Sequence, residues 1–118
     1  MRALNCSRGT ELARRVQKAD SFWKRLRGLG GRRCLPAGEA LWIIPCRGVH
    51  TRGMAFPIDV LFLDAVGTVL SLEENLEPGR FASIRWKART ALELPAGTLR
   101  DSRTGVGDRI EFQATEES

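Results

Sequence analysis

The chain has 118 residues, of which 42% are hydrophobic and 28% are charged, and its formal net charge is +5. This length suits one domain that buries roughly two thirds of the surface its unfolded chain exposes, and the composition excludes an intrinsically disordered protein. We therefore expect a single domain over residues 1–118, with a frayed tail at 113–118.

The charge is distributed unevenly along the chain. Residues 1–52 contain twelve Lys and Arg against three Asp and Glu, whereas residues 53–118 contain seven against eleven. Sixteen of the nineteen cations are Arg, whose planar guanidinium suits carboxylate and phosphate recognition. An anionic partner therefore has to be considered, although a coding bias toward Arg codons gives the same enrichment.

The three cysteines, Cys6, Cys34 and Cys46, are an odd number and form no C-x-x-C pair. This pattern indicates neither a disulfide framework nor a zinc ribbon, and it fits a reducing compartment. Residues 1–18 contain no apolar run of signal-peptide length, and no segment approaches the roughly 20 apolar residues of a membrane span. We expect a cytoplasmic protein without a membrane partner.

The N-terminal third is predicted to contain a hairpin and the chain's one firm helix. Residues 2–5 and 10–16 flank the turn-like sequence CSRG and favour two paired strands. A helix is predicted over residues 20–29, because apolar residues recur there at helical spacing between a capping Asp or Ser and the pair Gly30-Gly31.

The remaining elements are predicted to be strands. These fall at residues 41–44, 58–64, 68–72, 90–95 and 108–112, with loops at 75–81 and 96–105, the latter including one helical turn. The run 58–64 is apolar on both faces, so its hairpin with 68–72 is expected at the centre of a sheet. Six or seven short strands with one short helix predict an α+β, mainly β domain, as a small barrel or half-barrel.

Several phrases occur together in order: SFWKRLRGLGGR, GEALWIIPC, VHTRGMAFPIDVLFLD, LEP, and ALELPAGT followed by GD. Over roughly residues 10–112 they resemble domain-of-unknown-function family 192, a bacterial and archaeal family of small, mostly β domains. The resemblance implies a compact β fold. It implies no activity, since that family has no established biochemical function.

The sequence PCRGVHTRGMAFP, residues 45–57, spaces Cys46, His50 and Met54 four residues apart. If the loop curls, a thiolate, an imidazole and a thioether form a soft ligand set that favours Cu(I). The alternative is structural, because Cys and Met are among the most frequently buried residue types. We expect no cofactor, with Cu(I) as the alternative.

An enzymatic reading of the same residues makes Cys46 a nucleophile and His50 its base, with Asp59 or Glu93 orienting the imidazole. No family-type nucleophile signature surrounds Cys46, and the chain is small for an enzyme with a substrate pocket. These signals favour a binding domain over an enzyme.

A ligand-binding pocket requires less exact side-chain geometry than a metal site or a catalytic Cys–His pair. His50, Thr51 and Met54 lie on a loop that enters an apolar strand, where binding residues are common, and Asp59 and Glu93 supply polar groups to orient a ligand. We predict that these five residues line a pocket near residues 46–59 and 93 for a small ligand or a peptide of a partner protein.

The two carboxylates also have a structural interpretation. Asp59 and Glu93 each interrupt an apolar run, and a buried charge without a partner costs several kcal/mol. Ion pairs with Arg47, Arg52 or Arg89 are therefore expected ahead of a catalytic acid–base couple.

The predicted helix and the residues after it are basic. Nucleic-acid phosphates are the candidate partner of this surface, although a solvated helix face has the same composition. The cations concerned are Lys24, Arg25, Arg27, Arg32 and Arg33. We predict a monomer whose partner is a small ligand or a protein ahead of nucleic acid.

Overall fold

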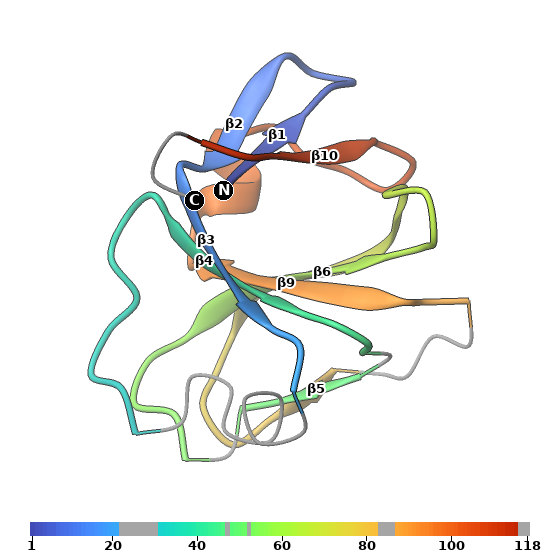
Figure 1. Ribbon diagram of the computed structural model, residues 1–118. Coiled ribbons are helices and arrows are strands. Elements are labelled where there is room, and N and C mark those ends of the chain that lie inside the picture. Colours follow the sequence, from blue (N-terminus) through green and yellow to red (C-terminus); the bar gives the residue numbers. More distant parts are fainter. Residues whose placement is uncertain (22–30, 47, 52, 83–86, 116–118) are drawn as a thin grey trace.

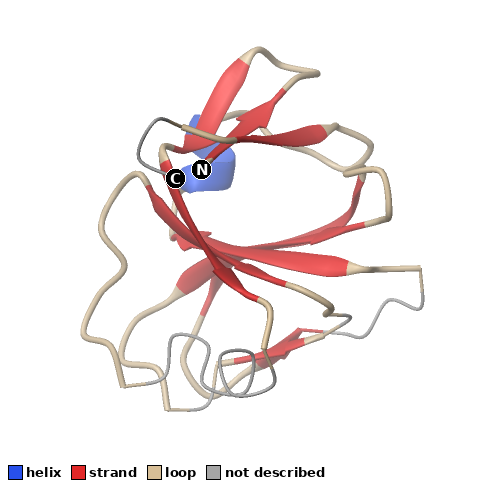
Figure 2. Ribbon diagram, viewed as in Figure 1, coloured by secondary structure: helices blue, strands red, loops and turns tan. Residues whose placement is uncertain are grey.

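The computed structural model describes residues 1–21, 31–46, 48–51, 53–82 and 87–115, and their strands form three layers (Figure 1, Figure 2). The predicted helix over 20–29 lies, apart from residues 20 and 21, outside this part of the chain. The described strands are β1 (Arg2–Asn5), β2 (Thr10–Ala13), β3 (Arg15–Ala19), β4 (Glu39–Ile43), β5 (Val49–His50), β6 (Ile58–Leu63), β7 (Val69–Leu76), β8 (Phe81–Ala82), β9 (Thr90–Pro95) and β10 (Ile110–Gln113). The short helix α2 (Thr98–Asp101) follows β9.

The middle layer is a five-stranded sheet in the order β3-β4-β9-β6-β7. One of its faces is covered by the sheet β10-β1-β2 together with α2, and the other by the pair β5-β8 (Figure 1). Only β3 and β4 run parallel; the other described pairs are antiparallel. The fold is therefore α+β and mainly β, as predicted, but the described strands form several sheets and do not close into a barrel.

Two hydrophobic cores lie on opposite faces of the middle sheet. The β5-side core consists of Ala19, Leu35, Leu41, Ile43, Val49, Met54, Ile58, Val60, Phe62, Ala82, Ala88 and Ala91. The α2-side core consists of Ala3, Leu12, Ala13, Ala40, Leu61, Leu63, Val69, Leu92, Leu94, Leu99 and Ile110. Successive residues of β6 alternate between the two cores, which explains why this strand is buried throughout and apolar on both faces.

The prediction of a central 58–64/68–72 hairpin is wrong in one respect. The hairpin forms, but β9 is the central strand, and β7 lies at the edge of the sheet. The second half of β7 carries Glu73, Glu74 and Asn75 as exposed side chains, whereas residues 91–94 of β9 are all buried. Apolar content on both faces is what a position between two neighbouring strands requires.

The run 10–16 is also not one strand. The amides of Arg14 and Arg15 both donate to the carbonyl oxygen of Gly38, and the chain bends there from the outer sheet into the middle sheet. The predicted loop at 75–81 is shorter than expected, because β7 continues to Leu76 and β8 begins at Phe81.

The turn at Val66-Gly67 forms as predicted, and it joins the middle sheet to the outer sheet β10-β1-β2. Gly67 has a φ of 88°, its carbonyl oxygen accepts the amide of Ile110 at 2.8 Å, and a Cβ added to it would collide with the carbonyl oxygen of Ile110. Only glycine adopts this conformation without strain at such a close approach.

We expect Gly67→Ala to lower the free energy of unfolding by about 2 kcal/mol, from backbone strain and overpacking together. Urea unfolding measures the loss. Gly107→Ala is the matched control, since Gly107 has a φ of 91° but nothing lies within 4 Å of its added Cβ. That variant should lose only about 1 kcal/mol; equal losses in the two variants would contradict the role given to Ile110.

Candidate functional site

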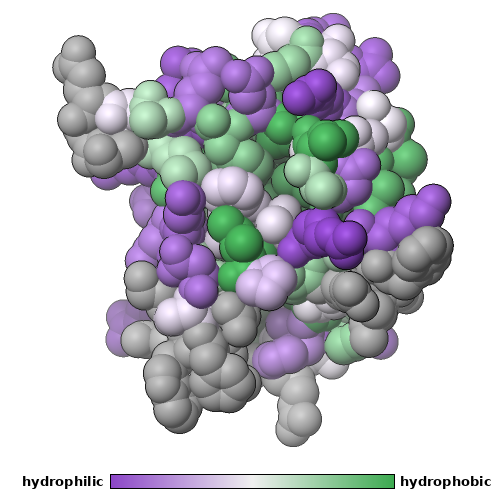
Figure 3. Space-filling model, turned by 45° about the vertical axis from the view of Figure 1, so that its right-hand side comes forward, coloured by the Kyte–Doolittle hydropathy of each residue, from purple (hydrophilic) through white to green (hydrophobic). Residues whose placement is uncertain are grey.

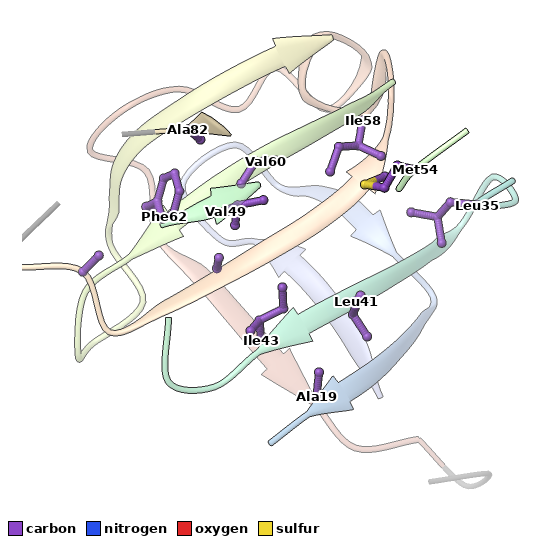
Figure 4. Close-up of a cluster of buried hydrophobic side chains, with 12 residues drawn as sticks. Ala19, Leu35, Leu41, Ile43, Val49, Met54, Ile58, Val60, Phe62 and Ala82 are labelled. Carbon is purple, nitrogen blue, oxygen red and sulfur yellow. The ribbon is translucent and has the colours of Figure 1, made fainter. Parts of the chain in front are cut away.

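The three residues of the proposed metal loop differ in their surroundings. Val49 of β5 is buried in the β5-side core, and His50, its neighbour on the strand, is exposed and lies opposite Phe81 of β8. Met54 is 8% exposed and packs into the same core near Leu35 and Ile58 (Figure 4). The imidazole and the thioether therefore face different environments.

Cys46 is half-buried and packs against the β5-side core. Its thiol donates to the carbonyl oxygen of Gly48 at 3.0 Å, and its amide donates to the carbonyl oxygen of Arg89 at 2.8 Å. Within the described ranges no cysteine forms a disulfide, and no group of three His, Cys, Asp or Glu side chains is placed to hold a metal ion. The Cu(I) and Cys–His hypotheses remain predictions.

Thr51 is fully buried and ties the loop after β5 to the turn before β8. Its hydroxyl donates to the carbonyl oxygen of Glu77 at 2.6 Å and accepts the amide of Arg80 at 2.8 Å. Its own amide and carbonyl bind Arg80 and Gly79. Thr51 therefore holds together the layer that covers the β5-side core.

Thr51→Val removes this hydroxyl at nearly constant volume. We expect it to cost about 2 kcal/mol of unfolding free energy, because two part-buried hydrogen bonds to the backbone are lost. Thr51→Ser is the control: it keeps the hydroxyl and should cost less than about 1 kcal/mol. Urea unfolding of both variants decides the matter, and a serine variant as unstable as the valine variant would show that the methyl group matters instead.

Asp59 is fully buried on the α2 side of the middle sheet, between Ile58 and Val60, which face the β5 side. One carboxylate oxygen accepts the amide of Asn75 at 2.8 Å; the other accepts the amides of Gly97 at 3.1 Å and Leu99 at 2.9 Å. Three backbone amides satisfy the hydrogen-bonding capacity of this carboxylate, in place of the expected ion pair with an arginine. Its place is structural.

Glu93 lies in the middle of the opposite face. The register of β9 places it between Leu41 of β4 and Val60 of β6, both members of the β5-side core. In Figure 4, β9 crosses this core between the side chains of β4 and those of β6. Glu93 is 2% exposed, and among the described residues no partner lies within hydrogen-bond distance of its Oε1.

Burial in these apolar surroundings raises the pKa of Glu93 from 4.5 to about 7. The ion pairs found within the described ranges are Arg2–Glu11, Arg8–Asp108 and Arg100–Asp101, so Arg89 does not neutralise Glu93, and Arg47 and Arg52 lie outside those ranges. A carboxyl that is buried, that has no partner among the described residues and that titrates near neutral pH is a candidate functional group.

The structure thus brings two of the five predicted ligand-binding residues, Met54 and Glu93, to one face of the sheet. His50 is exposed, Thr51 is occupied by backbone partners, and Asp59 lies on the other face.

The apolar neighbours of Glu93 were not among the predicted site residues. Leu41 and Val60 flank it directly, and Ser71, opposite Phe62 on the same face, has a buried hydroxyl without a partner among the described residues. The alternation of side chains along residues 58–63 indicates that Val60 shares a face with Ile58 and Phe62. The sequence does not indicate that β9 pairs with β4 and β6, which is what brings Leu41 and Val60 beside Glu93.

The basic surface is only partly described. Lys24, Arg25 and Arg27 lie outside the described ranges, Arg32 is half-buried and Arg33 is exposed. No helix within the described ranges has the length and apolar character needed to span a membrane. Hydrophobic and hydrophilic residues are intermixed on the face drawn in Figure 3.

A family model, that of DUF192, described as an uncharacterized ACR, matches residues 3–112. The chain is 33% identical to a UPF0127 protein of Pyrococcus furiosus over 114 residues, which cover 92% of the chain and 96% of that protein. It is 32% identical over 121 residues to a UPF0127 protein of Thermococcus sibiricus, covering 97% and 76%.

Two crystal structures share the fold. A protein from Sinorhizobium meliloti, provisionally described as a transcription regulator, superposes with a TM-score of 0.78 at 26% identity and covers 93% of this chain and 89% of that one. A protein of unknown function from Novosphingobium aromaticivorans gives 0.75 at 18% identity, with 95% and 93% covered, which is a likeness of fold alone.

Proposed function

We propose that this chain, which belongs to the DUF192 family of uncharacterised proteins, is a small-ligand-binding domain whose polar anchor is the carboxyl of Glu93. Small-molecule sites are mostly apolar and carry a few polar groups that fix the orientation of the ligand. Glu93 with Leu41, Val60 and Met54 has this composition.

The observation that carries the proposal is the Glu93 Oε1, which has no hydrogen-bond partner within the described ranges although the side chain is 2% exposed. A buried polar atom without a hydrogen bond costs about 1–3 kcal/mol, and such atoms are uncommon in native proteins. Asp59, equally buried in the neighbouring strand, has three amide partners, so the fold is able to satisfy a buried carboxylate. A ligand that supplies the missing partner explains the difference between the two.

The layer over Glu93 is suited to admitting a ligand. Its described strands, β5 and β8, have two residues each, so the strand pairing there is short, and short pairings open locally at a lower free-energy cost than long ones. We assign this binding function to a monomer in the cytoplasm, where the thiols of Cys6, Cys34 and Cys46 stay reduced.

A fragment screen followed by ¹H–¹⁵N chemical-shift mapping tests the proposal, with neutral, cationic and anionic molecules in the library. We expect hits that shift the amides of Leu41, Val60 and Glu93 in the wild-type chain and lose that effect in Glu93→Gln. Glu11→Gln, an exposed carboxyl in the outer sheet, is the control and should leave the hits unchanged. A library with no hit at these amides would overturn the proposal.

A further inference from the structure

Resting on the proposed function, the geometry points to an organic ammonium as the ligand: a small molecule with an apolar body and one protonated nitrogen that pairs with Glu93. The argument comes from the charges that share a sheet face with this carboxyl and from the acceptor it leaves unpaired. Both features select a cationic donor over a neutral or anionic group.

Among the residues that the structure describes, the charged groups nearest to Glu93 on its face are carboxylates. Glu73 of β7 lies opposite Val60 in the same cross-strand row, about 10 Å from Glu93 by strand spacing. Glu39 of β4 precedes Leu41, the cross-strand neighbour of Glu93, by two residues, which places it about 8 Å away on the diagonal. Within the described ranges, the charges closest to Glu93 on this face are therefore negative.

The described cations on the Glu93 side of the middle sheet lie at the edge of that sheet or in the loops beside it. Arg15 of β3 is exposed, and in register it neighbours Glu39 at the edge of the sheet. In the segments that contribute Leu35 and Ala88 to the β5-side core, Arg33, Lys87 and Arg89 are exposed, and Arg32 is half-buried.

The described residues of β5 and β6 bring no charge to this face. The inward side chains of β6 are Ile58, Val60 and Phe62, and β5 contributes Val49 while His50 is exposed. In the described part of the chain, the thiol of Cys46 also packs against this core, and it donates to the carbonyl oxygen of Gly48.

A bound ammonium supplies what this site lacks. It donates a charge-assisted hydrogen bond to Oε1 and neutralises the carboxylate, and hydrogen bonds of this kind are about twice as strong as neutral ones. A neutral alcohol donates as well but leaves the charge in place. A carboxylate ligand adds a like charge and is repelled.

The pH dependence distinguishes these ligands by its sign. An alkylammonium keeps its proton up to about pH 10, as a lysine does. It binds the ionised form of Glu93, so its affinity rises with pH as that carboxyl loses its proton near pH 7, by about tenfold between pH 6 and pH 8. A ligand that accepts a hydrogen bond from the protonated carboxyl shows the opposite trend.

Isothermal titration of the whole chain with hexylamine, hexan-1-ol and hexanoate at pH 6 and pH 8 tests the inference. We expect hexylamine to bind more tightly at pH 8 than at pH 6. Hexan-1-ol should bind more weakly than hexylamine at pH 8, and hexanoate should not bind. Glu93→Gln should abolish the preference for the amine, and Glu73→Gln should retain it with a smaller affinity. Raising the salt concentration should weaken the amine more than the alcohol.

If hexan-1-ol binds as tightly as hexylamine and Glu93→Gln binds neither, the preference for an ammonium is wrong, but the ligand site at Glu93 is supported. Amine binding that is unchanged in Glu93→Gln would overturn the pairing with this carboxyl. If none of the three probes binds, the inference that the ligand is an organic ammonium is wrong. The fragment screen then tests separately whether a ligand site exists.

Discussion

Replacing Glu93 with Gln is expected to raise the free energy of unfolding by about 3 kcal/mol at pH 8 and to leave it nearly unchanged near pH 4.5. Burial raises the pKa of this carboxyl from 4.5 to about 7. Between these values the folded chain holds a proton that the unfolded chain has released. Wild-type stability therefore falls as the pH rises from about 4.5 to 7 and stays low above that range, whereas Gln does not titrate.

Urea unfolding of the wild-type and variant chains at intervals between pH 4.5 and pH 8 measures the difference. Glu73→Gln is the control, since Glu73 shares the cross-strand row but is exposed, and its curve should stay parallel to that of the wild type. Asp108 does not interfere: a hydrogen bond from Asn5 lowers its pKa, so its contribution is lost only as the pH falls below 3.8. Parallel curves for Glu93→Gln and the wild type would contradict the buried, unpaired state of Glu93.

A gain in stability bears on function as well. Residues that weaken a fold are characteristic of sites, because binding and catalysis need groups that the folded chain leaves unsatisfied. If Glu93→Gln is more stable at neutral pH and no longer binds the amine, the same carboxyl accounts for both effects. If it is more stable and binding is unchanged, Glu93 is only a source of instability.

Local patterns in the sequence were enough for much of the fold. The apolar run that begins at Ile58 predicts a strand covered on both faces, and Gly67 marks the turn that follows it. The segment 96–105 was expected to hold one helical turn, and α2 forms there. These features depend on neighbours within a few residues, which periodicity and turn chemistry report directly.

The different positions of Asp59 and Glu93 could not be derived in this way. Both interrupt apolar strands, and nothing local distinguishes them. The pairing of β6 with β9 decides the outcome: Asp59 lies opposite Leu94 of the α2-side core, and Glu93 lies opposite Val60 of the β5-side core. A shift of one residue in this pairing, between segments 34 residues apart in sequence, would place both carboxylates on the same face.

The even spacing of Cys46, His50 and Met54 does not predict which of these side chains are buried together, for a related reason. Such spacing places side chains on one face only while a strand continues, and β5 is two residues long. After His50 the backbone turns to bring Thr51 against Glu77 and Arg80. These contacts belong to a distant part of the chain, so the exposure of His50 and the burial of Met54 were not predictable from the loop itself.

Asp59→Asn is expected to destabilise the protein by about 4 kcal/mol, the largest loss among the variants considered. The carboxylate accepts one amide on Oδ1, from Asn75, and two on Oδ2, from Gly97 and Leu99. The Asn side chain can accept on its single oxygen only, so its NH₂ group must face at least one of these donors. The Asn75 amide lies in a β-bulge of β7, where that residue has a φ of 54°, so the bulge and the start of α2 both lose their anchor.

Asp64→Asn is a control of matched chemistry. Asp64 accepts the amides of Val66 and Thr68 on the same oxygen, Oδ1, so an Asn oxygen can take over both bonds, and we expect a loss below about 1 kcal/mol. Urea unfolding gives the two values. Amide hydrogen exchange should quicken at Asn75, Gly97 and Leu99 in Asp59→Asn only. An equal, small loss in the two variants would mean that the three-amide arrangement contributes little.

The two buried carboxylates should therefore respond in opposite ways. Asp59 lies on the face away from the proposed ligand, so Asp59→Asn should lower stability while the folded fraction, measured at low temperature, keeps the wild-type affinity for hexylamine. Glu93→Gln should raise stability at pH 8 and lose that affinity. Because the two residues pair one position apart on β6 and β9, this reversal separates a carboxylate that holds the fold together from one that the fold leaves available for a ligand.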